Sequence, residues 1–277
     1  MRGRFRHLAV LVASLALLAA VPVAPTLGAS VTRCSIRNVD SGARSRTLQA
    51  AVDAASAGDR LLVRGICHGI TTIRRDLSIR GVRPAGAPVP TLDGDGLGVT
   101  LLTAQRAVVT MRSLTITGGD GYGAEGPPYA NGGGIVNRGR LTLRDVIVTG
   151  NHAHCGGGIS AQGPLVLRGT TSIHHNTATM CGGGIDIDAT FRAASVVMRD
   201  AATVHDNTSD GYAGGIDLWA GDHGATLTMR GTSAVHGNSA VNGGGILNDR
   251  GVLVGIDCAS PGTRSHDNTP DDCVSPA

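Results

Sequence analysis

A Gly-Gly-Gly-Ile tetrad recurs along the chain, and this repeat constrains the fold more than any other feature. Four isoleucines end such a tetrad, and a fifth ends the variant Ala-Gly-Gly-Ile. Successive isoleucines are 24, 26, 31 and 30 residues apart: Ile135, Ile159, Ile185, Ile216 and Ile246. Self-similarity with a period of about 20–50 residues is typical of solenoids. The chain is therefore predicted to stack similar coils on one another.

Each repeat also carries two short strand patterns and one asparagine. The first pattern is apolar-x-apolar-Arg, as in Leu141–Arg144, and the second is x-apolar-x, as in Ile147–Thr149. Period-2 alternation places the aliphatic residues inside the coil and their neighbours outside. The asparagines recur at intervals of 25, 31, 31 and 30 residues: Asn151, Asn176, Asn207, Asn238 and Asn268. Short strands with no helical stretch between them predict an all-β fold, a right-handed parallel β-helix (solenoid) of about seven coils.

The recurring residues themselves are expected to be structural. Stacked asparagine amides can hydrogen-bond along the solenoid axis and satisfy the backbone groups of a turn. The glycine tetrads are expected to mark a turn that needs positive φ and a close approach of neighbouring coils.

The two ends of the chain depart from the repeat. Segment Thr47–Ala57 has apolar residues at helical spacing, Thr47 can cap its start and Gly58 can end it. Because a solenoid exposes its core at both ends, this helix is expected to be a short N-terminal lid. The predicted layout is a signal peptide at 1–29 and a β-helix domain at 30–277, with an N-terminal cap at 30–60 and a disulfide-bonded C-terminal cap at 258–277.

The first residues predict export. Arg2, Arg4 and Arg6 precede the apolar run 8–21, and small residues follow as far as Ser30. This order is typical of a secretory signal peptide, here with cleavage near Ala29. The run is shorter than the roughly 20 residues of a membrane-spanning helix. The mature protein is therefore expected to be secreted, with no membrane association after cleavage.

The charge balance argues against one class of partner. All 24 basic residues are arginine, and three of them lie in the predicted signal peptide. The remaining 21 face 21 acidic residues, so the mature chain is close to neutral. A nucleic-acid-binding protein needs a net basic footprint, and none is expected here.

All six cysteines lie in the exported part, where disulfides persist. Cys155 and Cys181 each precede a tetrad, so they occupy equivalent positions on consecutive coils, which lie about 4.8 Å apart. This places a disulfide between Cys155 and Cys181. Proximity in the chain then predicts the other two pairs, Cys34–Cys67 and Cys258–Cys273.

Several segments together resemble bacterial pectin-lyase-like right-handed parallel β-helix proteins. They are the tetrads, the asparagine series, Leu48–Val52, Gly58-Asp59, Leu77–Gly81 and Leu114–Gly118. The Gly-Gly-x-Ile and asparagine repeats are also similar to those of polymorphic outer-membrane proteins. The resemblance covers about residues 47–268 and implies the β-helix fold. It implies no single function, because that superfamily includes lyases, hydrolases and adhesins.

Two outward columns are candidate sites. An arginine ladder continues through Arg144, Arg168, Arg199 and Arg230, and it suggests a groove for an acidic polymer such as a uronate polysaccharide. The alternative is an edge charge paired with local acids. A histidine ladder lies two residues before the asparagines, where closely spaced imidazoles are a candidate transition-metal site or a plain surface stack: His174, His205, His236 and His266.

A third candidate is acidic and follows the tetrads. Alternation places Asp186, Asp188, Asp217 and Trp219 outside on adjacent coils, with Asp222 and His223 nearby. The single Trp beside stacked carboxylates suggests a sugar-binding surface, and the three aspartates suggest a Ca²⁺ site or the acid and base of a glycoside hydrolase. A solvated acidic face is the alternative.

The leading hypothesis is a secreted, non-catalytic surface or matrix protein that binds a polysaccharide or another extracellular partner along a flat face. The first alternative is a polysaccharide lyase or glycoside hydrolase centred on the three aspartates. A weaker alternative is metal binding by the histidine ladder.

Overall fold

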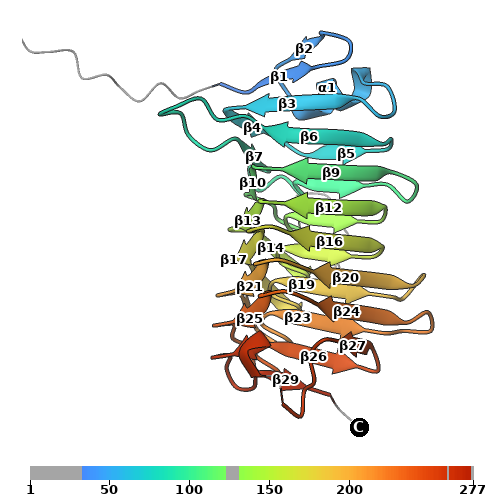
Figure 1. Cartoon of the computed structure of the whole chain (residues 1–277), viewed down its shortest axis with the longest axis vertical. Helices are drawn as coiled ribbons and strands as arrows, with labels where there is room; N and C mark the ends of the chain where they lie inside the picture. The colour runs from blue at the N-terminus through green and yellow to red at the C-terminus, as the bar shows by residue number, and fades with distance from the viewer. Residues whose placement is uncertain (1–32, 123–130, 261, 276–277) are drawn as a thin grey trace, which may run out of the picture. The chain divides into compact units, whose positions relative to one another are not determined.

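The computed structural model describes residues 33–122, 131–260 and 262–275, which belong to one compact unit. These residues form a parallel β-solenoid of about six turns, so the predicted fold class is confirmed and the coil number is close to the expected seven (Figure 1). The predicted signal peptide lies outside the described residues. No helix among them is long and apolar enough to cross a membrane.

Each turn of the solenoid passes through the same sheets in the same order. Sheet B runs in spatial order through β2 (Arg44–Ser45), β1 (Ser35–Asn38), β3 (Arg60–Arg64), β6 (Leu77–Gly81), β9 (Val108–Arg112), β12 (Arg140–Arg144), β16 (Pro164–Arg168), β20 (Ala194–Met198), β24 (Ala225–Met229) and β27 (Val252–Val254). Sheet A contains β4 (Ile66–His68), β7 (Thr91–Asp93), β10 (Thr115–Thr117), β13 (Ile147–Thr149), β17 (Ser172–His174), β21 (Thr203–His205), β25 (Ala234–His236) and β28 (Ser265–His266).

Two further sheets complete the coil. Sheet C contains β5 (Thr71–Ile73), β8 (Leu101–Thr103), β11 (Ile135–Asn137), β15 (Ile159–Ala161), β19 (Ile185–Asp188), β23 (Ile216–Trp219), β26 (Ile246–Asp249) and β29 (Cys273–Val274). A short sheet D, placed between sheets A and C, contains β14 (His152–Cys155), β18 (Thr177–Cys181) and β22 (Thr208–Ser209).

The predicted repeat is the repeat of the structure. The arginine-ended pattern forms sheet B, the x-apolar-x pattern forms sheet A, and each tetrad isoleucine begins a strand of sheet C. Strands pair in parallel with equivalent residues in register, as in Ile159↔Ile185 and Leu141↔Leu165. All five tetrad isoleucines are 0% exposed. Each such aliphatic side chain contributes roughly 1.5–3 kcal/mol through the surface it removes from water.

The three glycines of a tetrad have different tasks. The first glycine adopts positive φ, for example +65° at Gly156, and Ala213 takes the same conformation in the variant tetrad. The second lies against the next coil: a Cβ at Gly157 would approach the carbonyl oxygen of Thr177 to 2.2 Å. This contact leaves no room for a side chain, so the expected close approach of coils is confirmed.

The asparagine ladder runs along one edge of the solenoid. Each amide Nδ2 donates to the Oδ1 of the next asparagine at 2.9–3.0 Å from Asn151 to Asn268, and the backbone N–H groups donate to the same oxygens. Asp272 accepts from Asn268 and ends the series. The amides are buried and fully bonded, so their role is structural.

The N-terminal end is closed by α1 (Leu48–Ala54) and an antiparallel hairpin (Figure 1). Thr47 caps α1 by accepting from the backbone N–H of Ala50, as predicted, but the helix ends at Ala54, before Gly58. The hairpin of β1 and β2 is added to sheet B against β3, and the sequence pattern did not predict it.

The three predicted disulfide pairs are present. Their Cα–Cα distances are 4.6 Å for Cys34–Cys67, 4.5 Å for Cys155–Cys181 and 4.8 Å for Cys258–Cys273. Disulfides of this kind are typical of extracellular proteins.

Candidate functional site

The outer surface of sheet C contains two adjoining pockets of about 620 Å³ and 540 Å³, which share Asp188. We call them together the sheet C cleft. One column of side chains runs along its floor. It consists of the third residue after each tetrad isoleucine and changes from arginine to aspartate along the axis: Arg138, Gln162, Asp188, Trp219 and Asp249.

The three predicted aspartates lie at the acidic end of the cleft. Asp186 and Asp217 are neighbours in register on β19 and β23, and Asp188 is beside Trp219. Alternation with the core residue Ile187 directs these side chains away from the core, as expected. The alternative of a solvated acidic face is wrong, however. Asp186, Asp188 and Asp217 are only 3%, 8% and 7% exposed.

The pocket around these carboxyl groups is completed by residues that flank the strands of sheet C. The Cys155–Cys181 disulfide, Thr190 and Tyr212 line the same pocket. They exclude water from side chains that would be solvated on an open sheet.

Burial and mutual repulsion change the acidity of the buried aspartates. Desolvation, with the nearby charges of Asp217 and Asp188, raises the pKa of Asp186 well above its ordinary value. Desolvation, with the charge of Asp249, raises the pKa of Asp217 to about 7, although a backbone hydrogen bond from Leu218 acts in the opposite direction. Asp217 therefore keeps its proton to near neutral pH.

Aromatic side chains gather at the same cleft. Only 2% of the chain is aromatic, and the described Phe, Tyr and Trp residues are Tyr122, Phe191, Tyr212 and Trp219. Three of these four line the cleft. Phe191, Tyr212 and Trp219 are 80%, 46% and 45% exposed, and their grouping at one cleft is the kind of apolar patch that marks a binding site.

The opposite end of the cleft is basic. Arg74, Arg138 and Arg192 line the larger pocket with Gln162 and Phe191. Arg192 is held by donating from Nε to the carbonyl oxygen of Gln162 at 2.6 Å and from Nη2 to the carbonyl oxygen of Arg138. Partial burial and the charge of Arg138 lower the pKa of Arg192. These arginines were not among the predicted residues, although the constant third position after the tetrads could have identified Arg138.

The predicted arginine ladder lies elsewhere. Arg144 and Arg168 are in register on sheet B, and Arg199 and Arg230 directly follow β20 and β24 on the same sheet. None of the four lines the sheet C cleft. Arg144 approaches Asp145 at 3.5 Å, as the local-pairing alternative expected. Binding of an acidic polymer by this ladder stays a prediction.

The histidine ladder is a true stack on sheet A. Neighbouring ring centroids are 5.0, 5.0 and 5.2 Å apart, with interplanar angles of 15°, 4° and 7°, through His174, His205, His236 and His266. Desolvation, followed by repulsion from neighbouring imidazoles, lowers the pKa of His174 and of His236. Parallel rings do not direct their nitrogens to one point, and metal binding by the ladder stays a prediction.

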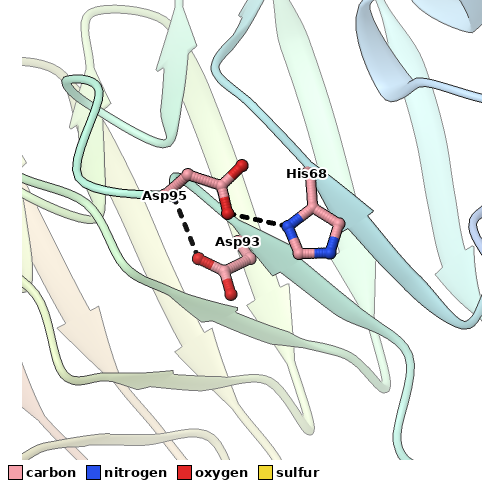
Figure 2. Close-up of side chains that lie close together, drawn as sticks. All are labelled: His68, Asp93 and Asp95. Carbon is pink, nitrogen blue, oxygen red and sulfur yellow. Dashed lines mark hydrogen bonds and ion pairs between the residues drawn. The ribbon is translucent and has the colours of Figure 1, made fainter. Parts of the chain in front are cut away.

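A group of His and Asp side chains lies on sheet A at the N-terminal end of the column that contains the histidine ladder (Figure 2). His68 on β4 is in register with Asp93 on β7, and Asp95 follows in the turn. The Nδ1 atom of His68 is 2.7 Å from Oδ1 of Asp95, and this contact raises the pKa of His68. Within the described part of the chain, these three are the only His, Cys or acidic side chains whose ligand atoms all lie within 4.8 Å of one another.

Sequence reasoning missed this group because the tetrads begin only after it. The predicted Ca²⁺ set of Asp186, Asp188 and Asp217 does not meet the same distance criterion and stays a prediction. Asp222 and His223 are exposed in the turn after β23, outside the cleft.

Comparison of the chain with protein families, curated proteins and solved structures finds no match. The parallel β-solenoid is therefore established from the structure alone, and the resemblance to pectin-lyase-like proteins remains an expectation.

Proposed function

We propose that this chain is a secreted polysaccharide-binding protein that holds a glycan along the sheet C cleft. The observation that supports this most is the concentration of exposed Phe191, Tyr212 and Trp219 around buried carboxyl groups in a chain with few aromatic residues. A flat aromatic side chain offers an apolar face to the C–H face of a sugar ring, and convergent polar groups orient the hydroxyls.

The charge of the cleft suggests how the glycan is oriented. Arg74 and Arg138 can pair with a carboxylate or sulfate on a sugar, because exposed guanidinium groups bind such anions with paired hydrogen bonds. At the other end, protonated Asp217 can donate a hydrogen bond to a neutral hydroxyl without repelling an anionic polymer. The best-fitting ligand is therefore a glycan that carries some acidic sugars.

Intrinsic fluorescence provides a direct test, because Trp219 is the only Trp of the chain. We expect oligogalacturonates to change the emission of Trp219, and Arg138→Gln to weaken that binding. Arg168→Gln on sheet B is the matched control and should leave the affinity unchanged. If Arg168→Gln weakens binding and Arg138→Gln does not, binding belongs to the arginine ladder. If neither acidic nor neutral glycans change the emission of Trp219, the proposal is refuted.

A second candidate function, glycosidic bond cleavage, is favoured by the raised pKa of Asp217. A carboxyl group with a pKa of about 7 can protonate a leaving oxygen at neutral pH. Register-matched Asp186 lies on the next strand, about 4.8 Å away along the axis, which is close to the roughly 5–5.5 Å carboxyl separation of retaining glycosidases.

Binding and cleavage are separated by one variant. Asp217→Asn should abolish the release of reducing ends or unsaturated sugars while glycan binding persists. If the wild-type protein binds a glycan but releases neither product over hours, cleavage is excluded for that glycan and the binding function stands alone.

A further inference from the structure

We propose that His68, Asp93 and Asp95 form a binding site for a divalent transition-metal ion. The site lies on sheet A and is independent of the glycan proposal. Its side chains come from two consecutive coils and the turn after the second, and Figure 2 shows all three converging on one region.

The donor set is chemically specific. It combines one imidazole nitrogen with two carboxylates, which suits first-row ions such as Zn²⁺ and Mn²⁺. Calcium and magnesium prefer oxygen donors alone, so the imidazole disfavours them. His68 and Asp95 have side chains 60% and 38% exposed, which leaves room for water to complete the coordination.

The distances agree with this chemistry. Zinc bonds to nitrogen or carboxylate oxygen at about 2.0–2.2 Å and is mostly tetrahedral, so two of its ligand atoms lie about 3.3–3.6 Å apart. The Nδ1 atom of His68 and Oδ1 of Asp95 are 2.7 Å apart in their hydrogen bond, so a side-chain movement of less than about 1 Å opens the pair for an ion that replaces the shared proton. The third donor, on Asp93, lies within 4.8 Å of both other atoms and can take a further position after small side-chain rotations.

The same column contains His–Asp pairs that lack a second carboxylate. The Nδ1 atoms of His205 and His266 are each 2.8 Å from an oxygen of the following aspartate, Asp206 or Asp267. The register neighbours of these histidines are other histidines. At His68 the register neighbour is Asp93, which adds the third donor. The histidines of the later coils therefore form simple ion pairs, whereas His68 in the first coils has two carboxylates beside it.

A metal ion here would join consecutive coils. It would link β4 to β7 beside Cys67, whose disulfide already ties this coil to Cys34 in the N-terminal cap. Because the ion binds only the folded arrangement, it should stabilise the N-terminal coils of the solenoid by mass action.

The test titrates Zn²⁺ into the EDTA-treated protein by calorimetry and follows the melting temperature. We expect one ion per chain at this site and a higher melting temperature with Zn²⁺. His68→Gln and Asp93→Asn should each weaken the Kd for Zn²⁺ at least tenfold. Asn at 93 keeps the oxygen that accepts from the Asp95 N–H, so the turn is preserved. His205→Gln removes a paired histidine of the same column and should leave the Kd for Zn²⁺ unchanged.

The proposal is overturned if His68→Gln and Asp93→Asn bind Zn²⁺ as the wild type does, or if His205→Gln abolishes binding. Equal binding of Ca²⁺ that is insensitive to His68→Gln would also overturn it, because the imidazole would not be a ligand. Metal-free melting temperatures of the variants establish that they fold. Should either variant be unstable, Asp95→Asn in the exposed turn gives the same decision, since Asn tolerates the φ of 55° found there.

Discussion

Sheet C and sheet A are built by the same coils, yet their outward polar residues differ in burial. On sheet C, carboxyl groups stack beneath a disulfide and aromatic side chains and are more than nine-tenths buried. On sheet A, imidazoles stack on an open face and are only half-buried. Desolvation favours the neutral form in both places. It raises the pKa of Asp217 and lowers that of His236.

The difference shows that a solenoid repeat does not dictate the chemistry of its surface. Neutral aspartates can exchange protons or donate hydrogen bonds inside a cleft, whereas neutral histidines in an open stack mainly avoid mutual repulsion. The two regions should therefore contribute opposite pH dependences to the free energy of unfolding, and the sheet C contribution should be the larger.

The largest effect is expected from Asp217. Its pKa in the folded protein lies above the unfolded value of 3.8, so its stabilising contribution is complete below pH 3.8 and is lost as the pH rises through about 7. Roughly three pKa units correspond to about 4 kcal/mol. Asp217→Asn should remove most of this slope in denaturant titrations between pH 4 and 7.5, and it should stabilise the protein at pH 7.5.

Asp222→Asn, in the exposed turn after the same strand, is the matched control and should keep the wild-type slope. A wild-type stability that rises steadily from pH 4 to 7.5 would contradict the burial of a protonated Asp217.

A smaller effect of opposite sign is expected from the histidine ladder. The pKa of His236 is lowered in the folded protein, so its contribution to stability is present above the unfolded value of 6.5 and is lost as the pH falls through the folded value. His236→Gln should reduce the loss of stability on acidification, and the exposed His223→Gln should not. NMR titration of the ring protons checks the same shift directly; an ordinary pKa for His236 would show that the stack has no electrostatic cost.

The smallest effect is expected from the exposed ion pairs of sheet A. The hydrogen bond from His205 lowers the pKa of Asp206, whose side chain is half exposed. Asp206→Asn should cost about 0–1 kcal/mol near pH 6, less in high salt, as measured by denaturant midpoints. Asp267→Asn should behave alike. A loss of several kcal/mol in the free energy of unfolding would mean that these pairs hold the turn in its conformation.

The architecture follows from the sequence pattern. Recurring tetrad isoleucines, arginine-ended strands and the asparagine series were enough to predict the parallel β-solenoid, and equivalent positions of Cys155 and Cys181 were enough to predict their disulfide. These features are predictable because each coil repeats the same local pattern, so register follows from counting residues.

The environment of the surface residues became clear only from the folded chain. Alternation correctly directed Asp186 and Asp217 outward, but their burial comes with Tyr212 and the Cys155–Cys181 disulfide, which lie just before the tetrads and outside the strand pattern. The site at His68 and Asp95 combines a strand with a turn outside the tetrad region, where no period can be read. A strand pattern determines which side of a sheet a residue occupies, whereas burial, pKa and the meeting of ligand atoms depend on neighbouring coils and on turns that the pattern does not describe.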